Sequence, residues 1–337
     1  MSPPPPVLVS ELSVFQRIRR VPGVVAGLVR DGVSESWGFG SVAAGASRVP
    51  DALTVFEVGS ITKVFTATLL AWLAEQGALS LDEPIRPLLE PHVKLKDWQG
   101  REVTLLHLAT HTSTLPRASR RMMALALRNP SNPYAEYQLE DLHADLAEFE
   151  PGPELGRAFE YSTLGFGLLG HLLTQIAAEP FEQLLSRRVC QPLDLSDTVI
   201  TLNDEQRARL AQGYFFGRPA SLWDMPVLAG AGALRSTAAD MLRVLECSLG
   251  LESTELDASL RATQEPRVRA SDTLGIGLAW HRTPLDPGGP DAVWHRGETA
   301  GMRGFVGFVR ERGLGLVLLA NASAGVDELG LELLERV

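Results

Sequence analysis

A serine and a lysine stand three positions apart at 60 and 63, in the segment VGSITK. A serine hydroxyl is a poor nucleophile at its own pKa and needs an adjacent base. On a helix, positions i and i+3 share one face, with Cβ atoms about 5–6 Å apart, so Lys63 would lie beside Ser60. Helix N-termini also favour an oxyanion through their free N–H groups and dipole. The spacing therefore predicts Ser60 as a nucleophile with Lys63 as a proton carrier.

The residues around this pair distinguish a catalytic role from a simple helix cap. A Ser-x-x-Lys spacing alone occurs by chance about once in a few hundred residues, and then means a cap and a solvated lysine. Here residues 62–76 read as a helix too apolar for a surface position. A lysine on such a helix is poorly solvated, loses its proton more easily and can serve as a base.

Two further segments carry groups that would complete a site. Tyr161, in the segment FEYST, ordinarily titrates near pH 10 and needs a nearby cation such as Lys63 to act as a base. The alternative is a core aromatic with its hydroxyl bonded to backbone. Residues 294–301, WHRGETAG, form a glycine-rich strand edge that can lend an N–H to an oxyanion hole. Its alternative is an ordinary glycine turn with an exposed histidine.

Taken in order, the three segments resemble the Ser-x-x-Lys, Tyr-x-Asn and Lys-Thr-Gly (or His-x-Gly) elements of class C β-lactamases and D,D-peptidases. Four more segments resemble that family: LSLDEP at 79–84, LLHLATHTSTLP at 105–116, YSTLGFGLLG at 161–170 and GALRSTAAD at 232–240. The resemblance covers residues from about 15 to about 325. It implies an acyl-enzyme on Ser60, with Lys63 and Tyr161 sharing the proton and the N–H groups of Ser60 and Glu298 holding the oxyanion.

Two positions depart from the family pattern. Thr163 stands in place of the asparagine that holds the substrate's amide, and it offers one hydroxyl with less reach. His295, two positions before Gly297, stands in place of the lysine near the β-lactam carboxylate, and a mostly neutral imidazole attracts that carboxylate less. The resemblance implies that Thr163, His295, Gly297 and Glu298 contribute to the oxyanion and substrate site. The departures favour the esterase or peptidase branch.

We therefore predict a serine hydrolase acting on small esters, with weak or no β-lactamase activity. A D-amino-acid-type peptidase or amidase, and a β-lactamase, stay open as alternatives. So do an acyltransferase of the same fold and a silent penicillin-binding-like protein, although intact Ser60, Lys63 and Tyr161 speak against the last. Which of Lys63 and Tyr161 is the base stays open, because coupled groups titrate as a pair.

Composition limits the partners of this 337-residue chain. Its net charge of −10 disfavours binding to nucleic acid and anionic lipid, and no apolar stretch reaches the roughly 20 residues of a membrane helix. The proline-rich start does not resemble a secretory signal, so we expect a cytoplasmic protein. Cys190 and Cys247 have no metal or disulfide spacing. His107 and His111 have the spacing of a metal pair but lack a third ligand, so we expect no metal. We also expect no cofactor, and a small molecule as the substrate. The oligomeric state stays open.

The periodicity predicts an α/β (α+β) fold of the β-lactamase and penicillin-binding-protein type. Strand hairpins at 24–39 and 304–320 should build an antiparallel sheet from both chain ends, flanked by helices. Helices are expected at 62–76, 104–110, 139–148, 164–178, 238–249 and 326–337. We predict one catalytic unit, with a flexible proline-rich tip at 1–14, an α/β lobe at 15–85 and 225–337, and an inserted all-α lobe at 86–224.

Overall fold

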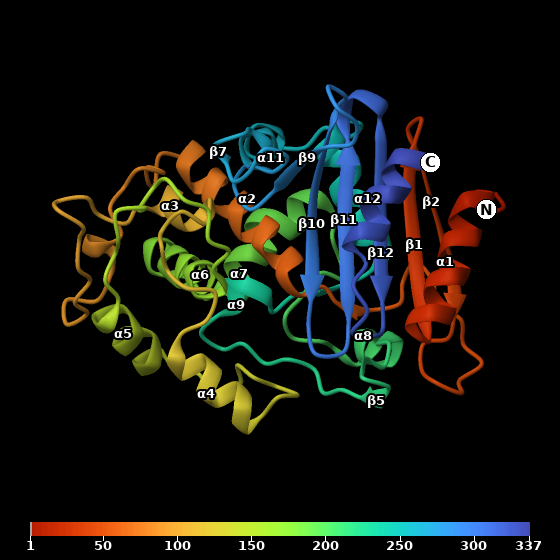
Figure 1. The fold of residues 1–337 in the computed structure, drawn as a ribbon, viewed down its shortest axis with the longest axis horizontal. Coiled ribbons are helices and arrows are strands. Elements are labelled where there is room, and N and C mark those ends of the chain that lie inside the picture. The colour runs from red at the N-terminus through yellow and green to blue at the C-terminus, as the bar shows by residue number, and fades with distance from the viewer. Residues whose placement is uncertain (1) are drawn as a thin grey trace.

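The computed structural model describes residues 2–337 and is organised around an eight-stranded antiparallel sheet (Figure 1). The strand order is β2-β1-β12-β11-β10-β9-β8-β7. The strands are β1 (Gly23–Arg30), β2 (Val33–Gly40), β7 (Val268–Arg269), β8 (Gly275–Ile276), β9 (His281–Pro284), β10 (Asp291–Glu298), β11 (Arg303–Val309) and β12 (Leu314–Ala320). Because β1 pairs with β12, the two chain ends meet within the sheet, which confirms the predicted architecture.

The terminal hairpins form where the sequence predicted them. Asp31 and Gly32 connect β1 to β2 with φ values of 54° and 75°, the left-handed backbone that a two-residue hairpin turn requires. In β12, all seven residues are buried, and seven of the eight are buried in β1. Alternation of apolar and polar residues is absent from these strands because helices cover both faces of the sheet.

Two hydrophobic clusters lie on opposite faces of the sheet. On one face, α1 (Pro6–Arg19) and α12 (Asp327–Arg336) pack with residues such as Val24 and Leu318. On the other face, Val25 and Leu319 belong to a larger cluster that continues through α10 (Ala238–Leu249) and α2 (Thr62–Glu75) into the helical part of the chain. That larger cluster joins the sheet to the helices, and α2, which begins just after Ser60, belongs to it.

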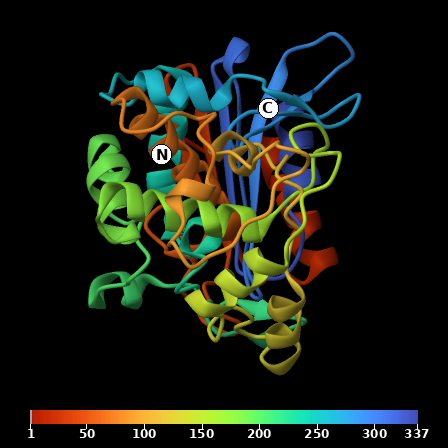
Figure 2. The same cartoon turned by 90° about the vertical axis from the view of Figure 1, so that its left-hand side faces the viewer.

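The helical part faces the viewer when the molecule is turned by 90°, with the sheet behind it (Figure 2). It contains α3 (Leu105–Ala109), α4 (Arg120–Arg128), α5 (Leu139–Glu148), α6 (Thr163–Ala177), α7 (Phe181–Leu185), α8 (Asp204–Arg209) and α9 (Ala229–Gly232). α11 (Asp257–Gln264) packs on α2, and the short strand pairs β3–β6 (Phe56–Glu57 with Arg235–Ser236) and β4–β5 (Tyr214–Phe215 with Arg218–Pro219) complete the fold. The division into lobes at residues 86 and 225 stays a prediction.

The predicted flexible tip is wrong for residues 6–14, which form most of α1; Met1 lies outside the described residues. Proline is tolerated in the first turn of a helix, where its missing N–H has no partner to lose. Leu8 and Leu12 are then fully buried against the outer face of the sheet, and this burial fixes the helix. Between residues 2 and 337, no helix has both the length and the apolar character needed to span a membrane.

Candidate active site

Ser60 lies in a 3₁₀ turn, Gly59–Ile61, that leads directly into α2. Gly59 has a φ of 48°, and a Cβ there would lie 2.6 Å from the backbone N of Glu298. Only glycine therefore lets the turn approach the end of β10 this closely. The turn places the half-buried Ser60 at the N-terminal end of a helix and close to the main chain of Glu298.

Lys63 is fully buried in the first turn of α2. Its Nζ lies 2.9 Å from Ser60 Oγ and 2.6 Å from the carbonyl oxygen of Ala231. Burial, with a smaller contribution from the nearby Arg117 cation, holds the pKa of Lys63 well below its usual value. The amine is therefore held against the Ser60 hydroxyl in an environment that favours its neutral form, which carries a lone pair able to accept a proton.

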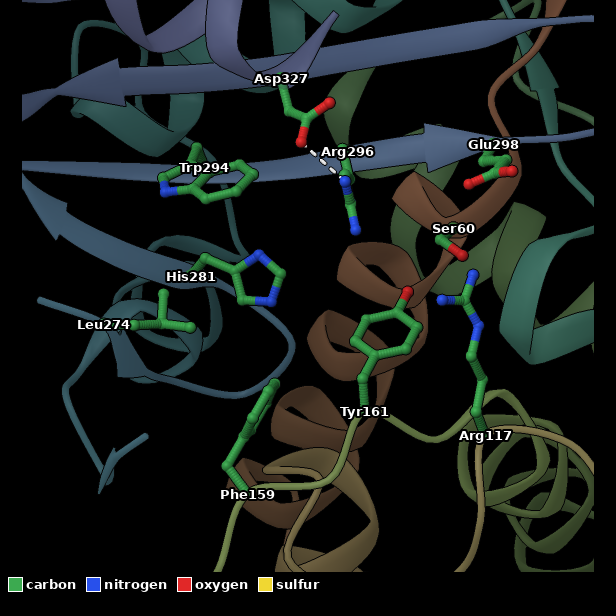
Figure 3. Close-up of a pocket in the computed structure, with 10 residues that line it drawn as sticks. All are labelled: Ser60, Arg117, Phe159, Tyr161, Leu274, His281, Trp294, Arg296, Glu298 and Asp327. Atoms are coloured by element: carbon green, nitrogen blue, oxygen red, sulfur yellow. Dashed lines mark hydrogen bonds and ion pairs between the residues drawn. The ribbon is translucent and has the colours of Figure 1, made fainter. Parts of the chain in front are cut away.

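Tyr161 precedes α6 and faces the same serine. Its hydroxyl points toward Ser60 (Figure 3), and Lys63 Nζ lies 5.1 Å from the centre of its ring. Burial raises the pKa of Tyr161 to about 12, although its hydrogen bond with Ser60 and the Arg117 charge lower it in part. At neutral pH the phenol therefore keeps its proton and is a donor.

β10 presents its residues alternately to two environments. Trp294, Arg296 and Glu298 line the cavity above Ser60. Gly297 faces the other way, where a Cβ would lie 1.9 Å from the carbonyl oxygen of Val58, so glycine is needed for the strand to approach the turn that carries Ser60. The register of β10 thus carries Glu298 to the serine and keeps Gly297 out of the cavity.

His295 is fully buried on the same side of β10 as Gly297. Its Nδ1 lies 2.7 Å from the carbonyl oxygen of Arg296, its ring stacks on His281 at 5.1 Å, and its Nε2 has no hydrogen-bond partner in residues 2–337. Burial holds the pKa of His295 well below its usual value, so the ring is neutral. The neutral imidazole agrees with the prediction. The structure adds that His295 is not among the residues that line the cavity.

Thr163 begins α6 and is only 8% exposed. Its backbone N donates to the carbonyl oxygen of Arg117, and its side chain does not line the cavity. Of the four residues predicted for the oxyanion and substrate site, Glu298 lines the cavity, whereas Thr163, His295 and Gly297 do not.

The cavity above Ser60 has a volume of about 270 Å³ and is lined by Ser60, Arg117, Phe159, Tyr161, Leu274, His281, Trp294, Arg296, Glu298 and Asp327 (Figure 3). Arg296 is neutralised by Asp327 at 2.6 Å, and Glu298 is paired with Arg303 at 2.8 Å. Arg117 has no carboxylate partner within residues 2–337 and lies 5.7 Å from the centre of the Tyr161 ring. It is thus a positive charge of the cavity that no carboxylate neutralises. Sequence reasoning missed it, although it directly follows the segment ending in Pro116.

The two histidines considered as a metal pair serve the backbone instead. His107 Nδ1 accepts from the backbone N of Thr104 at 3.2 Å, at the start of α3. His111 is fully buried, accepts from the backbone N of Ser162 at 3.0 Å and packs on the Tyr161 ring at 4.4 Å. His111 therefore holds the loop that carries Tyr161.

This fold, an antiparallel sheet from both chain ends with a serine at the mouth of a central helix, is that of the β-lactamases and penicillin-binding proteins. The Beta-lactamase family model matches residues 12–335, and the chain belongs to that family. It is 25% identical to the D-alanyl-D-alanine-carboxypeptidase/endopeptidase AmpH of Escherichia coli (strain K12), over 88% of this chain and 80% of the relative. It is 27% identical to a Beta-lactamase of Lysobacter lactamgenus, over 94% and 86%.

A solved structure shares the fold. The Beta-Lactamase/D-Alanine Carboxypeptidase from Pseudomonas syringae superposes with a TM-score of 0.85 at 22% identity, covering 98% of this chain and 97% of that one. The likeness extends over the sheet and the helices alike, which agrees with the fold predicted from the motifs.

Proposed function

We propose that this protein is a serine hydrolase that acts through an acyl-enzyme on Ser60. The observation that carries the proposal is the contact between Ser60 Oγ and the fully buried Lys63 Nζ at 2.9 Å. Incubation with a fluorophosphonate should add one adduct to the intact protein, and peptide mapping should place it on Ser60. An unmodified protein, or an adduct on another residue, would contradict the proposal.

The geometry supports one division of labour between the proton carriers. Lys63, whose pKa is lowered, takes the proton as Ser60 Oγ bonds to the substrate carbonyl carbon. The N–H groups of Ser60 and Glu298 hold the resulting oxyanion. Tyr161, whose pKa is raised to about 12, donates its proton to the leaving group and is reprotonated from Lys63. Water then attacks the acyl-enzyme, losing a proton along the same path, and Ser60 is released.

This assignment predicts how activity depends on pH. Lys63 must be neutral to accept the proton, so kcat/KM should fall as the pH drops through its lowered pKa. Arg117→Gln removes a positive charge that lowers the pKa of Lys63. In this variant the fall of kcat/KM on the acidic side of the pH profile should therefore occur at higher pH. Arg117→Lys should leave this fall near its original pH. If the fall of kcat/KM at acidic pH occurs at the same pH in Arg117→Gln as in the wild type, protonation of Lys63 does not cause it.

For the substrate we propose small esters with a simple acyl group. The neutral, buried His295 offers no charge to a β-lactam carboxylate, and Thr163 offers no amide. Losing a hydrogen bond to a charged group costs about 1.5–3 kcal/mol, roughly ten- to a hundredfold in specificity. We therefore expect kcat/KM for p-nitrophenyl butyrate to exceed that for nitrocefin by at least about tenfold. A nitrocefin value equal to or above the ester value would overturn this preference.

Arg117 favours a second candidate, a carboxylate-bearing peptide or β-lactam. Relatives of this chain are named D-alanyl-D-alanine-carboxypeptidase/endopeptidase and Beta-lactamase, and an arginine can bind a carboxylate with two hydrogen bonds. On this reading Arg117→Gln should raise KM for a D-alanyl-D-alanine peptide by about tenfold or more and leave the neutral ester's KM unchanged. Arg120→Gln, an equal charge change at a nearby exposed residue, is the control. Equal effects of both variants would rule out a specific carboxylate contact.

Hydrolysis must also be distinguished from acyl transfer. Product analysis in the presence of added alcohols and amines would detect transfer directly, because an acceptor that intercepts the acyl-enzyme appears acylated. We expect the free acid as the main product.

A further inference from the structure

A second cluster of reactive side chains lies in the helical part, apart from the active-site cavity. It joins Glu90, which follows the 3₁₀ turn Arg86–Leu88, to His143 of α5 and His171 of α6. None of the three lines the cavity above Ser60. All three are largely shielded, with side chains exposed by 24%, 14% and 13% in that order.

The donor atoms of this cluster converge. His143 Nε2 lies 3.2 Å from Glu90 Oε2, and His171 Nε2 lies 3.2 Å from Glu90 Oε1. The three residues can offer one ligand atom each such that all lie within 4.8 Å of one another. Tetrahedral Zn²⁺ with bonds of about 2.0–2.1 Å places its ligands roughly 3.3 Å apart. Each imidazole already lies at this separation from one of the two carboxylate oxygens of Glu90.

Two of these atoms have no hydrogen bond. Glu90 Oε2 and His143 Nε2 are buried and unpartnered among residues 2–337, although they face each other. His143 Nδ1 lies 3.2 Å from Nε2 of His92, which can hold the ring with its Nδ1 protonated. Nε2 then presents a lone pair toward the carboxylate, an arrangement that a cation between them would satisfy.

One of the three residues also borders a cavity. A cavity of about 280 Å³ opens beside His171, with Thr174 and Gly170 of the same helix in its wall. An ion held by three protein ligands keeps its fourth position for a water.

We propose that Glu90, His143 and His171 bind a zinc ion that ties the loop at residue 90 to α5 and α6. Two imidazoles with one carboxylate suit Zn²⁺, whereas Mg²⁺ and Ca²⁺ favour sets of oxygen ligands. From the sequence we expected no metal, because the pair with metal-like spacing, His107 and His111, has no third ligand nearby in the chain. The proposed ligands are far apart along the chain and form no motif.

The test is zinc titration of the EDTA-treated full-length protein by calorimetry, together with thermal unfolding. We expect one equivalent of ZnCl₂ to bind and to raise Tm. His171→Ala and Glu90→Gln should each weaken zinc binding by about a hundredfold or more and abolish the rise in Tm, because each removes a ligand of the ion. Glu140→Gln removes a carboxylate from the exposed face of α5 and should change neither.

Co²⁺ in place of Zn²⁺ provides a spectroscopic measurement that does not depend on the stability of the variants. Its visible absorption band should appear on the wild-type protein and on Glu140→Gln, and disappear in Glu90→Gln. Ester hydrolysis should persist in Glu90→Gln, because the cluster lies outside the catalytic cavity. Wild-type protein that binds no zinc would show that protons alone bridge the cluster and would overturn the proposal. Glu90→Gln and His171→Ala variants that bind zinc as tightly as the wild type would show that the ion binds elsewhere and would overturn it equally.

Discussion

Replacing Ser60 with alanine should lower kcat by a factor on the order of 10⁴ or more and eliminate fluorophosphonate labelling, because the nucleophile is lost from a group of residues that act as a unit. The fold should persist. Alanine suits the start of a helix, and Lys63 keeps its hydrogen bond to the carbonyl oxygen of Ala231. Steady-state kinetics on p-nitrophenyl butyrate and mass spectrometry of the labelled protein measure the two effects.

The matched control for this experiment is Ser47→Ala, at an exposed serine in the loop after β2. It should keep both labelling and turnover. Circular dichroism and a Tm within about 4 °C of the wild type would show that Ser60→Ala is folded. Wild-type turnover in Ser60→Ala would refute the role of Ser60, and with it the acyl-enzyme proposal.

Lys63→Met and Tyr161→Phe should each lower kcat by about 10² or more, since each removes a group that carries the proton. Methionine approximates the length of the buried lysine, and phenylalanine removes only the hydroxyl that points toward Ser60. The double variant should lose little more than the worse single variant, because both residues serve one proton path. A double loss equal to the product of the single losses would count against that path.

Tyr214→Phe is the control for the tyrosine change. Its hydroxyl accepts from the backbone N of Ala44 at 2.8 Å, and the residue does not line the cavity. We expect kcat to stay within about twofold of the wild type, because the lost hydrogen bond affects only local stability. Unfolding of Lys63→Met must be measured separately, since the carbonyl of Ala231 loses its buried partner at a cost of about 1–3 kcal/mol.

Features that depend on local spacing could be predicted from the sequence. The helices at 139–148 and 238–249 begin and end at the predicted residues, because apolar periodicity and end signals such as Thr237 are local. Ser60 and Lys63 face each other because three positions on a helix bring side chains to one face. The strands β1 and β12 could also be predicted, because helices cover both faces of the sheet and each strand is therefore a continuous apolar run in the sequence.

The start of the chain shows where composition misleads. The prolines suggested an extended tip, but local preference is weak beside tertiary burial. Leu8 and Leu12 gain a buried site on the sheet only if residues 6–19 are helical. The helix N-terminus also places its prolines where a missing N–H costs nothing. The burial of Leu8 and Leu12 contributes to the free energy of folding only when the distant strands of the sheet are already assembled.

By itself, the sequence indicated the family and predicted the nucleophile and its two proton carriers, because the motifs that carry them are residue types at short, fixed spacings. Only the tertiary structure decided what surrounds them. The register of β10 turns His295 and Gly297 away from the cavity and brings Arg296 and Glu298 into it, and a one-residue change of register would reverse this. The unpaired charge of Arg117 likewise depends on packing between segments far apart in the chain, which no local pattern records.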